Sequence, residues 1–257
     1  MTAVFVAWQD TALTRSWHPI GRLDQLDGGD YVFRYVKGVN EAEERAGFRP
    51  LAAFPEIDKV YRSESLFSFF GNRIMSPNRE DFEEFTSQLG LDARHADPMH
   101  ILAASGGRRQ TDSFEVFPTP KPDGEGRYHY RCFLHGWRHT SDAAQNRIES
   151  LESGDELRIA CEVDNPVTGL AFQVQTDDYH MIGWMPRYLI ADLRTAMGRL
   201  DEFRHKLSVA RLNPDPVSHH YRVILEMAME LPGGVTPFFS EEFHPLAPVE
   251  AFSLHSR

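Results

Sequence analysis

The stretch YHYRCFLHGWRH, residues 128–139, changes character halfway along. Up to Leu134, apolar and aromatic residues alternate with polar ones, which is the period of a β-strand with one buried face. From Gly136 onward the residues are aromatic and basic, and they run into Thr-Ser-Asp at 140–142, a typical helix-cap sequence. The stretch therefore predicts a strand that is followed at once by an aromatic and basic turn.

The sequence after this stretch predicts further strands and two short helices. Strands are predicted over residues 156–163, 170–175, 181–184, 204–211 and 220–231, with a turn at 164–166. Helices are predicted over residues 143–151 and 187–197.

The sequence before it predicts a short antiparallel meander and several helices. Strands are predicted over residues 4–8, 17–23, 31–36 and 113–117, and helices over 41–46, 65–70, 81–91 and 97–104. Asp97 and Pro98 suit the N-cap and first position of the last helix, and Ser63 suits the N-cap of the helix at 65–70.

Three prolines and two glycines within residues 118–126 mark a linker. We therefore expect one domain over 1–120, a second over 121–231, and a proline-rich C-terminal tail over 232–257 that wraps over the surface. The fold class expected from these elements is α+β.

Composition excludes several classes of protein. The 257 residues contain no apolar run of about 18, so we expect no membrane span. The first residues lack a signal-peptide pattern and there are only two cysteines, so a cytoplasmic protein without a disulfide framework is expected. The net charge is −11, from 13 basic and 18 acidic residues in 1–120 and 14 basic and 20 acidic residues in 121–257. Any nucleic-acid contact must then rest on a local patch.

The sequence offers little for catalysis or for a metal. There is no phosphate-loop motif, and the glycine-rich basic segment 105–111 is better interpreted as a helix C-cap and turn. The twelve histidines show no metal-ligand spacing, and the adjacent His219 and His220 would point to opposite faces of a strand. Cys132 reads as a buried structural thiol. We expect no enzyme, cofactor or metal, and a metal-dependent nuclease or hydrolase is kept as a minor alternative.

Two segments combine aromatic and basic residues, at 136–139 and at 182–189. Aromatic faces can stack on unpaired bases and arginine can hold phosphate, so these segments favour single-stranded nucleic acid. The alternative interpretation is that Trp137 and Trp184 cover a small hydrophobic core.

Residues 128 to about 197 resemble a HIRAN domain. The matching segments are residues 133–139, 151–157, 164–166 with 171–174, and 182–184 followed by a helix. The resemblance implies a small six-stranded β-barrel, related to OB folds and carrying appended helices. Eukaryotic members of the family hold the 3′ end of single-stranded DNA.

Carried over by position, the resemblance implies a nucleic-acid site with one departure. Gly136, Arg138 and His139 match one family segment, and Gly183, Trp184 and Arg187 match another in form. Where the DNA-end binders carry a Tyr-Asp pair, this sequence has Val167 and Thr168. The candidate nucleic-acid-binding residues are Trp137, Arg138, His139, Thr168, Trp184 and Arg187.

Residues 4–117 resemble the N-terminal subdomain of HipA-type toxin kinases. The resemblance is carried by residues 20–23, 31–35, 50–55, 66–74, 101–107 and 114–117. It implies a mixed α/β subdomain without catalytic residues, which in the family packs on a kinase core or acts as a separate regulatory subunit.

Together these observations predict a non-enzymatic bacterial protein that binds single-stranded DNA, with 3′ ends as a candidate target, in DNA repair or defence. The alternative is a protein-interaction or regulatory module of a HipA-like toxin–antitoxin kinase system, with such a kinase as partner of the first half.

Overall fold

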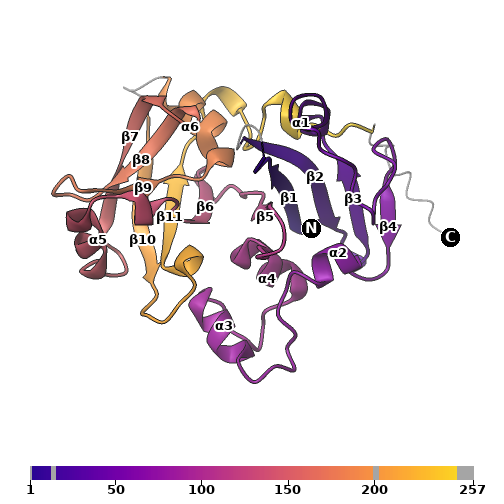
Figure 1. The fold of residues 1–257 in the computed structure, drawn as a ribbon, viewed down its shortest axis with the longest axis horizontal. Helices are drawn as coiled ribbons and strands as arrows, with labels where there is room; N and C mark the ends of the chain where they lie inside the picture. The colour runs from indigo at the N-terminus through magenta and orange to yellow at the C-terminus, as the bar shows by residue number, and fades with distance from the viewer. Residues whose placement is uncertain (1, 13–15, 199–202, 248–257) are drawn as a thin grey trace.

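The computed structural model describes residues 2–12, 16–198 and 203–247, and it contains two antiparallel sheets with short helices around them (Figure 1). The predicted α+β class is therefore confirmed. No described helix has the length and apolar character needed to cross a membrane.

The first sheet has the strand order β4-β3-β2-β1-β5. Its strands are β1 (Thr2–Gln9), β2 (Trp17–Gln25), β3 (Tyr31–Tyr35), β4 (Tyr61–Ser63) and β5 (Phe114–Pro118). The predicted meander is present. Strands β1, β2 and β3 follow one another and pair antiparallel, with Val4 of β1 opposite Leu23 of β2. β5 returns from a long helical excursion to pair with β1.

The structure describes four short α-helices in this half of the chain, one between β3 and β4 and three between β4 and β5. They are α1 (Gly38–Ala46), α2 (Ser68–Gly71), α3 (Phe82–Gln88) and α4 (Pro98–Ser105). As predicted, Asp97 caps α4, its Oδ1 accepting hydrogen bonds from the backbone N–H groups of Met99 (2.8 Å) and His100 (3.0 Å). Ser63 is not an N-cap, because it ends β4, a strand that the sequence did not reveal, and α2 starts only at Ser68.

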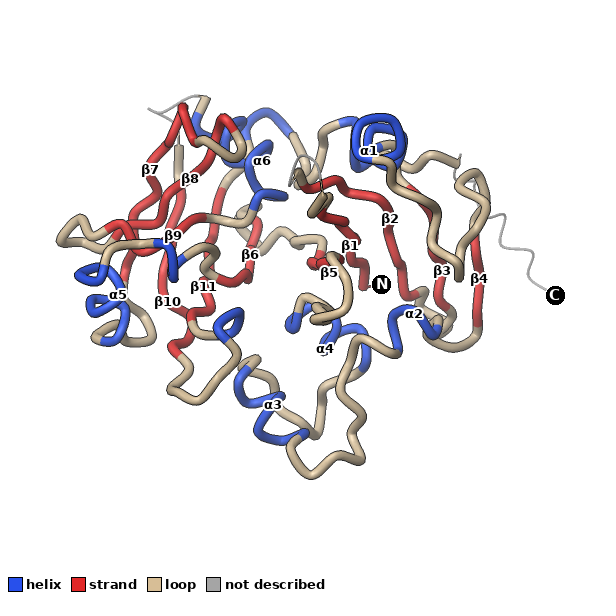
Figure 2. The backbone as a smooth tube through the Cα atoms, in the orientation of Figure 1, coloured by secondary structure: helices blue, strands red, loops and turns tan. Residues whose placement is uncertain are grey.

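The second sheet has the order β6-β11-β10-β7-β8-β9. Its strands are β6 (Tyr128–Phe133), β7 (Glu156–Asn165), β8 (Gly169–Gln175), β9 (Met181–Trp184), β10 (His205–Leu212) and β11 (Val223–Met229). Helices α5 (Asp142–Glu149) and α6 (Ile190–Met197) lie beside it (Figure 2). The expected barrel is not confirmed, since the sheet is not closed. One isolated bridge links the chain just after β6 to β9, where His135 and Trp184 exchange backbone hydrogen bonds of 3.0 and 2.9 Å.

Three sequence predictions in the second half need correction. The turn predicted at 164–166 falls later, because β7 continues to Asn165 and β8 starts at Gly169. The helix predicted over 187–197 begins as a 3₁₀ turn, Arg187–Leu189. The strand predicted over 220–231 begins only at Val223, and His219–Tyr221 form a separate 3₁₀ helix, η3.

The hydrophobic core continues from one half of the chain into the other. Phe5 and Phe117, on the back of the first sheet, belong to the same buried cluster as residues of the second sheet. Phe117 stacks face to face on Tyr188, with ring centroids 3.9 Å apart and the planes within 1°. The domain boundary at 120 stays a prediction, but the two halves share packing.

The segment 232–247 is anchored in this core by Phe238 and Phe243, while most of its other residues keep partial or full exposure on the surface, as expected of the tail. Phe238 and Phe243 are each 4% exposed, and their rings lie 5.3 and 5.1 Å from that of Phe5. Buried Asp192 fixes the segment by accepting a hydrogen bond from the backbone N–H of Phe238 (3.1 Å) and one from the Tyr130 hydroxyl (3.0 Å). Two phenylalanines anchor the segment where local sequence indicated only proline-rich coil.

Candidate nucleic-acid interface

The aromatic and basic turn after β6 is built around Gly136. Its φ of 68° lies in the left-handed region that favours glycine. A Cβ at this position would also lie 2.6 Å from Cε3 of Trp184, so the indole packs directly on the glycine backbone. The chain turns here into the 3₁₀ helix η1 (Trp137–His139), which carries three of the predicted site residues.

These three residues line a pocket of about 170 Å³ between the two halves of the chain. The first half contributes one lining residue, from the segment after α4, and the second half contributes the others. The lining residues are Arg108, Phe133, Leu134, His135, Gly136, Trp137, Arg138, His139, His219 and His220. Two arginines and four histidines are among them, and none of these lining residues is acidic, although the whole chain carries a net charge of −11.

Arg108 is held in place by partners from several elements. Its guanidinium forms an ion pair with buried Glu115 and lies 5.6 Å from the ring centroid of Trp17. Its Nη1 is 3.4 Å from Nδ1 of His220. Burial alone would raise the pKa of Glu115, but Arg108 and His135 outweigh burial and lower that pKa to about 2. The carboxylate therefore stays ionised at neutral pH and balances the charge of Arg108.

The two adjacent histidines lie side by side, with ring centroids 3.8 Å apart. The sequence prediction that they would point to opposite faces of a strand is wrong because η3 replaces the strand here. Burial, together with the nearby arginines, lowers the pKa of both, and that of His220 falls to about 4. Both rings are therefore mainly neutral at pH 7.

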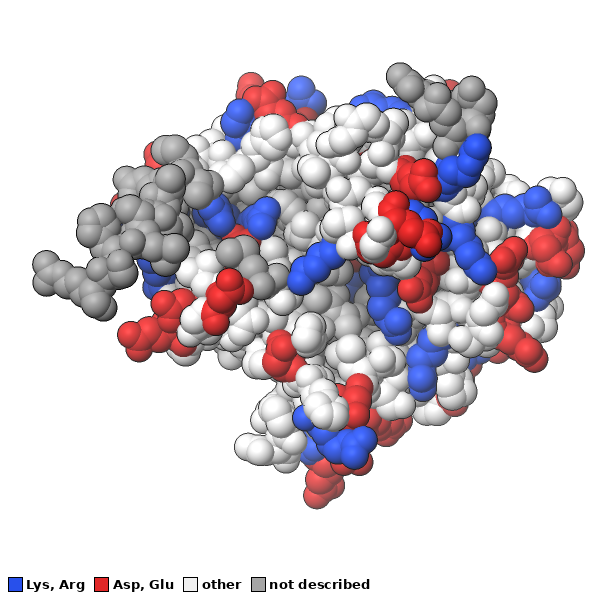
Figure 3. Space-filling view, turned by 180° about the vertical axis from the view of Figure 1, so that it is seen from behind, with Lys and Arg blue, Asp and Glu red and all other residues white. Residues whose placement is uncertain are grey.

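Arg138 is the exposed cation of the pocket, and no ion pair joins it to a carboxylate among the residues that the structure describes. Since Glu115 balances Arg108, Arg138 supplies most of the net positive charge at neutral pH. Figure 3 shows the molecule from behind, with positive and negative residues interspersed rather than gathered into one basic surface. This face therefore offers a polyanion only local attraction.

The other predicted site residues lie outside this pocket. Trp184 stands behind Gly136, and its Nε1 donates to Oε2 of Glu162 at 2.7 Å. The side chain of Asn165 also donates to Glu162 (3.1 Å) and accepts from the Thr168 hydroxyl (3.0 Å). Thr168 is thus tied to the turn between β7 and β8.

Arg187 lines a smaller neighbouring hollow of about 60 Å³, together with Glu115 and His135. Trp137 packs partly on the core and donates its Nε1–H to the backbone carbonyl of His219 at 3.0 Å. Core packing, the alternative interpretation of the tryptophans, therefore accounts for part of what Trp137 does, whereas Trp184 packs on the backbone of Gly136.

Sequence reasoning missed Arg108, His219 and His220. The segment containing Arg108 was noted for its glycines and basic residues, and its interpretation as a C-cap and turn is confirmed at Gly106, which has a φ of 72°. Nothing in the sequence connects it to His220, which is 112 positions away. The pairing of Arg108 with Glu115 across a short loop was the available signal.

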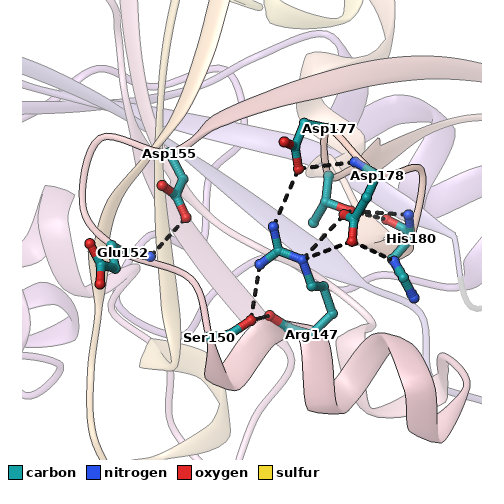
Figure 4. Close-up of polar contacts among 8 residues, drawn as sticks. Arg147, Ser150, Glu152, Asp155, Asp177, Asp178 and His180 are labelled. Carbon is teal, nitrogen blue, oxygen red and sulfur yellow. Dashed lines mark hydrogen bonds and ion pairs between the residues drawn. The ribbon is translucent and has the colours of Figure 1, made fainter.

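A second polar hollow, of about 250 Å³, lies between α5 and the turn after β8 (Figure 4). Arg147 is occupied there by carboxylates, with Nε 3.2 Å from both oxygens of Asp178 and Nη2 3.3 Å from Asp177. Asp155 and Glu156 also line it. This acidic surrounding suits an anion poorly, and Arg147 serves to tie α5 to the turn.

Over the described part of the chain, no group of three or more His, Cys, Asp or Glu side chains is arranged to hold a metal ion.

No protein-family model matches the chain, and no curated protein matches it. Solved structures similar to it include a protein from Lactobacillus plantarum, with 19% identity, 38% of this chain and 89% of that chain covered, and a TM-score of 0.32. They also include the HIRAN domain of human HLTF, with 14% identity, 39% of this chain and 74% of that chain covered, and a TM-score of 0.29. At such scores neither likeness indicates a function for this chain. The resemblance of the first half to HipA-type kinases stays a prediction.

Proposed function

We propose that the chain is a non-enzymatic protein that binds single-stranded nucleic acid, with a backbone phosphate in the pocket between Arg108 and Arg138. The observation that carries the proposal is the lining of this pocket, which has two arginines and four histidines and no acidic residue in an otherwise acidic chain. Imidazole and guanidinium groups are among the donors that bind phosphate oxygens in proteins.

The charge balance sets the character of this binding. Because Glu115 balances Arg108 and the paired histidines are mainly neutral, the free pocket offers about one cation at pH 7. A bound phosphate favours the charged forms of His219 and His220, so binding takes up protons and strengthens as the pH falls. The expected affinity is modest and more sensitive to pH than that of a typical basic binder.

Single strands are favoured over duplexes because the indole of Trp137 borders the pocket beside Arg138. An unpaired base next to the bound phosphate can reach this aromatic edge, whereas a stacked and paired base cannot. Thr168 lies outside the pocket and its hydroxyl is already bonded to Asn165, so we propose no requirement for a 3′ hydroxyl.

The test is a fluorescence-polarisation titration with one labelled oligonucleotide, offered as a single strand and as a blunt duplex. We expect the single strand to bind more tightly, with affinity rising from pH 7.5 to pH 6. The logarithm of the binding constant should fall with the logarithm of salt with a slope of about −0.7 to −1.4, since roughly one or two phosphates are contacted. A steep salt slope, equal binding of the duplex, or no binding would contradict the proposal.

A further inference from the structure

Another pocket, of about 180 Å³, has Glu115 in its lining and lies between the two halves of the chain. Ala103, Ala104 and Gly106, from α4 and its C-cap, form one wall. Phe133 and Ile224, from β6 and β11, lie in the facing wall. The space exists because small residues on α4 stand opposite large apolar ones.

The lining is mainly apolar and partly aromatic, since Phe117 and Tyr188 also border it. Apolar pockets with a few polar groups, placed between structural units, are the usual form of a small-molecule site. An apolar cavity of about 150 Å³ is known to accept benzene, so a pocket of this size takes a ligand of one aromatic ring. The walls and the volume together limit the occupant to a small, flat apolar body.

The charged residues in the lining determine which polar group a ligand of this pocket should carry. Glu115 also lines the pocket, and its carboxylate is committed to Arg108 and His135. Arg131 has Nη2 within 3.2 Å of the backbone carbonyl of Leu89. Arg131 is exposed overall, and desolvation of the packed part of its side chain lowers its pKa, an effect that Glu226 opposes and Arg211 reinforces. A carboxylate on the ligand would stabilise this guanidinium, while a cationic group would be repelled.

We propose that this pocket binds a small aromatic carboxylate, with its ring between α4 and the second sheet and its carboxylate on Arg131. The site is separate from the phosphate pocket, because the two share only Phe133 in their linings. It does not depend on nucleic-acid binding.

Three probes of equal ring size, benzoate, benzyl alcohol and benzylamine, test the proposal by ligand-observed NMR titration of the full chain. Benzoate should bind saturably, more tightly than benzyl alcohol, and benzylamine most weakly. Arg131→Gln should lower the affinity for benzoate about tenfold, the usual loss for one charge-assisted hydrogen bond, and leave benzyl alcohol unchanged. Arg158→Gln, an exposed arginine on β7, is the matched control.

Ala104→Leu should fill the space and abolish binding of both benzoate and benzyl alcohol. Ala191→Leu, on α6 and also half-buried, serves as its control, and the dispersion of the amide spectrum shows whether each variant is folded. If Ala104→Leu does not fold, Arg131→Gln still decides the question. The proposal is overturned if none of the probes binds saturably, if benzylamine binds as well as benzoate, or if a folded Ala104→Leu variant binds as the unchanged chain does.

Discussion

Oε1 of Glu115, in the first half of the chain, lies 3.6 Å from Nε2 of His135 in the second half. The same carboxylate forms the ion pair with Arg108, so one buried side chain joins both halves at the edge of the phosphate pocket. Glu115 is 3% exposed, and its position therefore depends on these partners rather than on water. The arrangement gives the carboxylate a structural role and leaves Arg108 placed for a ligand.

Neutralising this carboxylate should destabilise the fold. Glu115→Gln leaves the charge of Arg108 without its buried partner, and we expect a loss of about 3 kcal/mol in the free energy of unfolding. This loss is at the lower end of the range for breaking a buried ion pair, because the Arg108 side chain keeps 23% exposure to water. Urea unfolding of the variant measures it. Glu56→Gln, which breaks the exposed pair with Lys59, should change stability by less than about 0.5 kcal/mol. Equal effects of the two variants would disprove the structural role of Glu115.

The turn at Gly136 should tolerate no side chain. Gly136→Ala combines a left-handed backbone with a Cβ 2.6 Å from the Trp184 ring, and we expect a loss of about 2–4 kcal/mol in stability. Gly169→Ala is the matched control, because its φ of 71° is equally left-handed and nothing lies within 4 Å of its Cβ. It should cost about 1–2 kcal/mol, from backbone strain alone. Thermal unfolding of both variants checks whether the indole contact adds to the strain.

Stability should depend on pH through His220. Its pKa falls from 6.5 to about 4 on folding, so the unfolded chain takes up a proton more readily than the folded one. The contribution of His220 is fully present above pH 6.5 and is lost as the pH falls towards 4. We expect His220→Gln to show a smaller loss of stability over this window, measured by urea unfolding at pH 7 and pH 4.5. Parallel pH profiles of the two proteins would contradict the assignment.

Asp192 should act in the opposite direction. Burial raises its pKa from 3.8 to about 6, against the hydrogen bonds from Phe238 and Tyr130. The folded state therefore holds a proton that the unfolded state releases, and stability falls as the pH rises from about 4 to about 6. In Asp192→Asn this fall is absent, so its stability relative to the unchanged chain should improve by roughly 2 kcal/mol between pH 4 and pH 7. The same urea series measures it, and a constant difference would count against a buried, protonated Asp192.

Much of the fold follows from local sequence, as the capping of α4 by Asp97 and the alternation of Tyr128–Phe133 illustrate. The sequence revealed only some of the residues of the candidate site, because the others come from distant parts of the chain. Trp137, Arg138 and His139 could be identified from their own segment, whereas Arg108 and His220 meet them only through the packing of the two halves. Phe238 was hidden for the same reason, since only the folded core shows what a proline-rich segment contacts.

The central claim is that Arg138 supplies the charge that holds a phosphate of single-stranded nucleic acid. Its most direct test compares Arg138→Ala with Arg194→Ala, an exposed arginine on α6 in the same half, by polarisation titration of a labelled single strand at pH 6.5. We predict that Arg138→Ala weakens binding about tenfold or more, the effect of one charge-assisted contact, and that Arg194→Ala leaves it unchanged. Equal affinities of the two variants would contradict the claim.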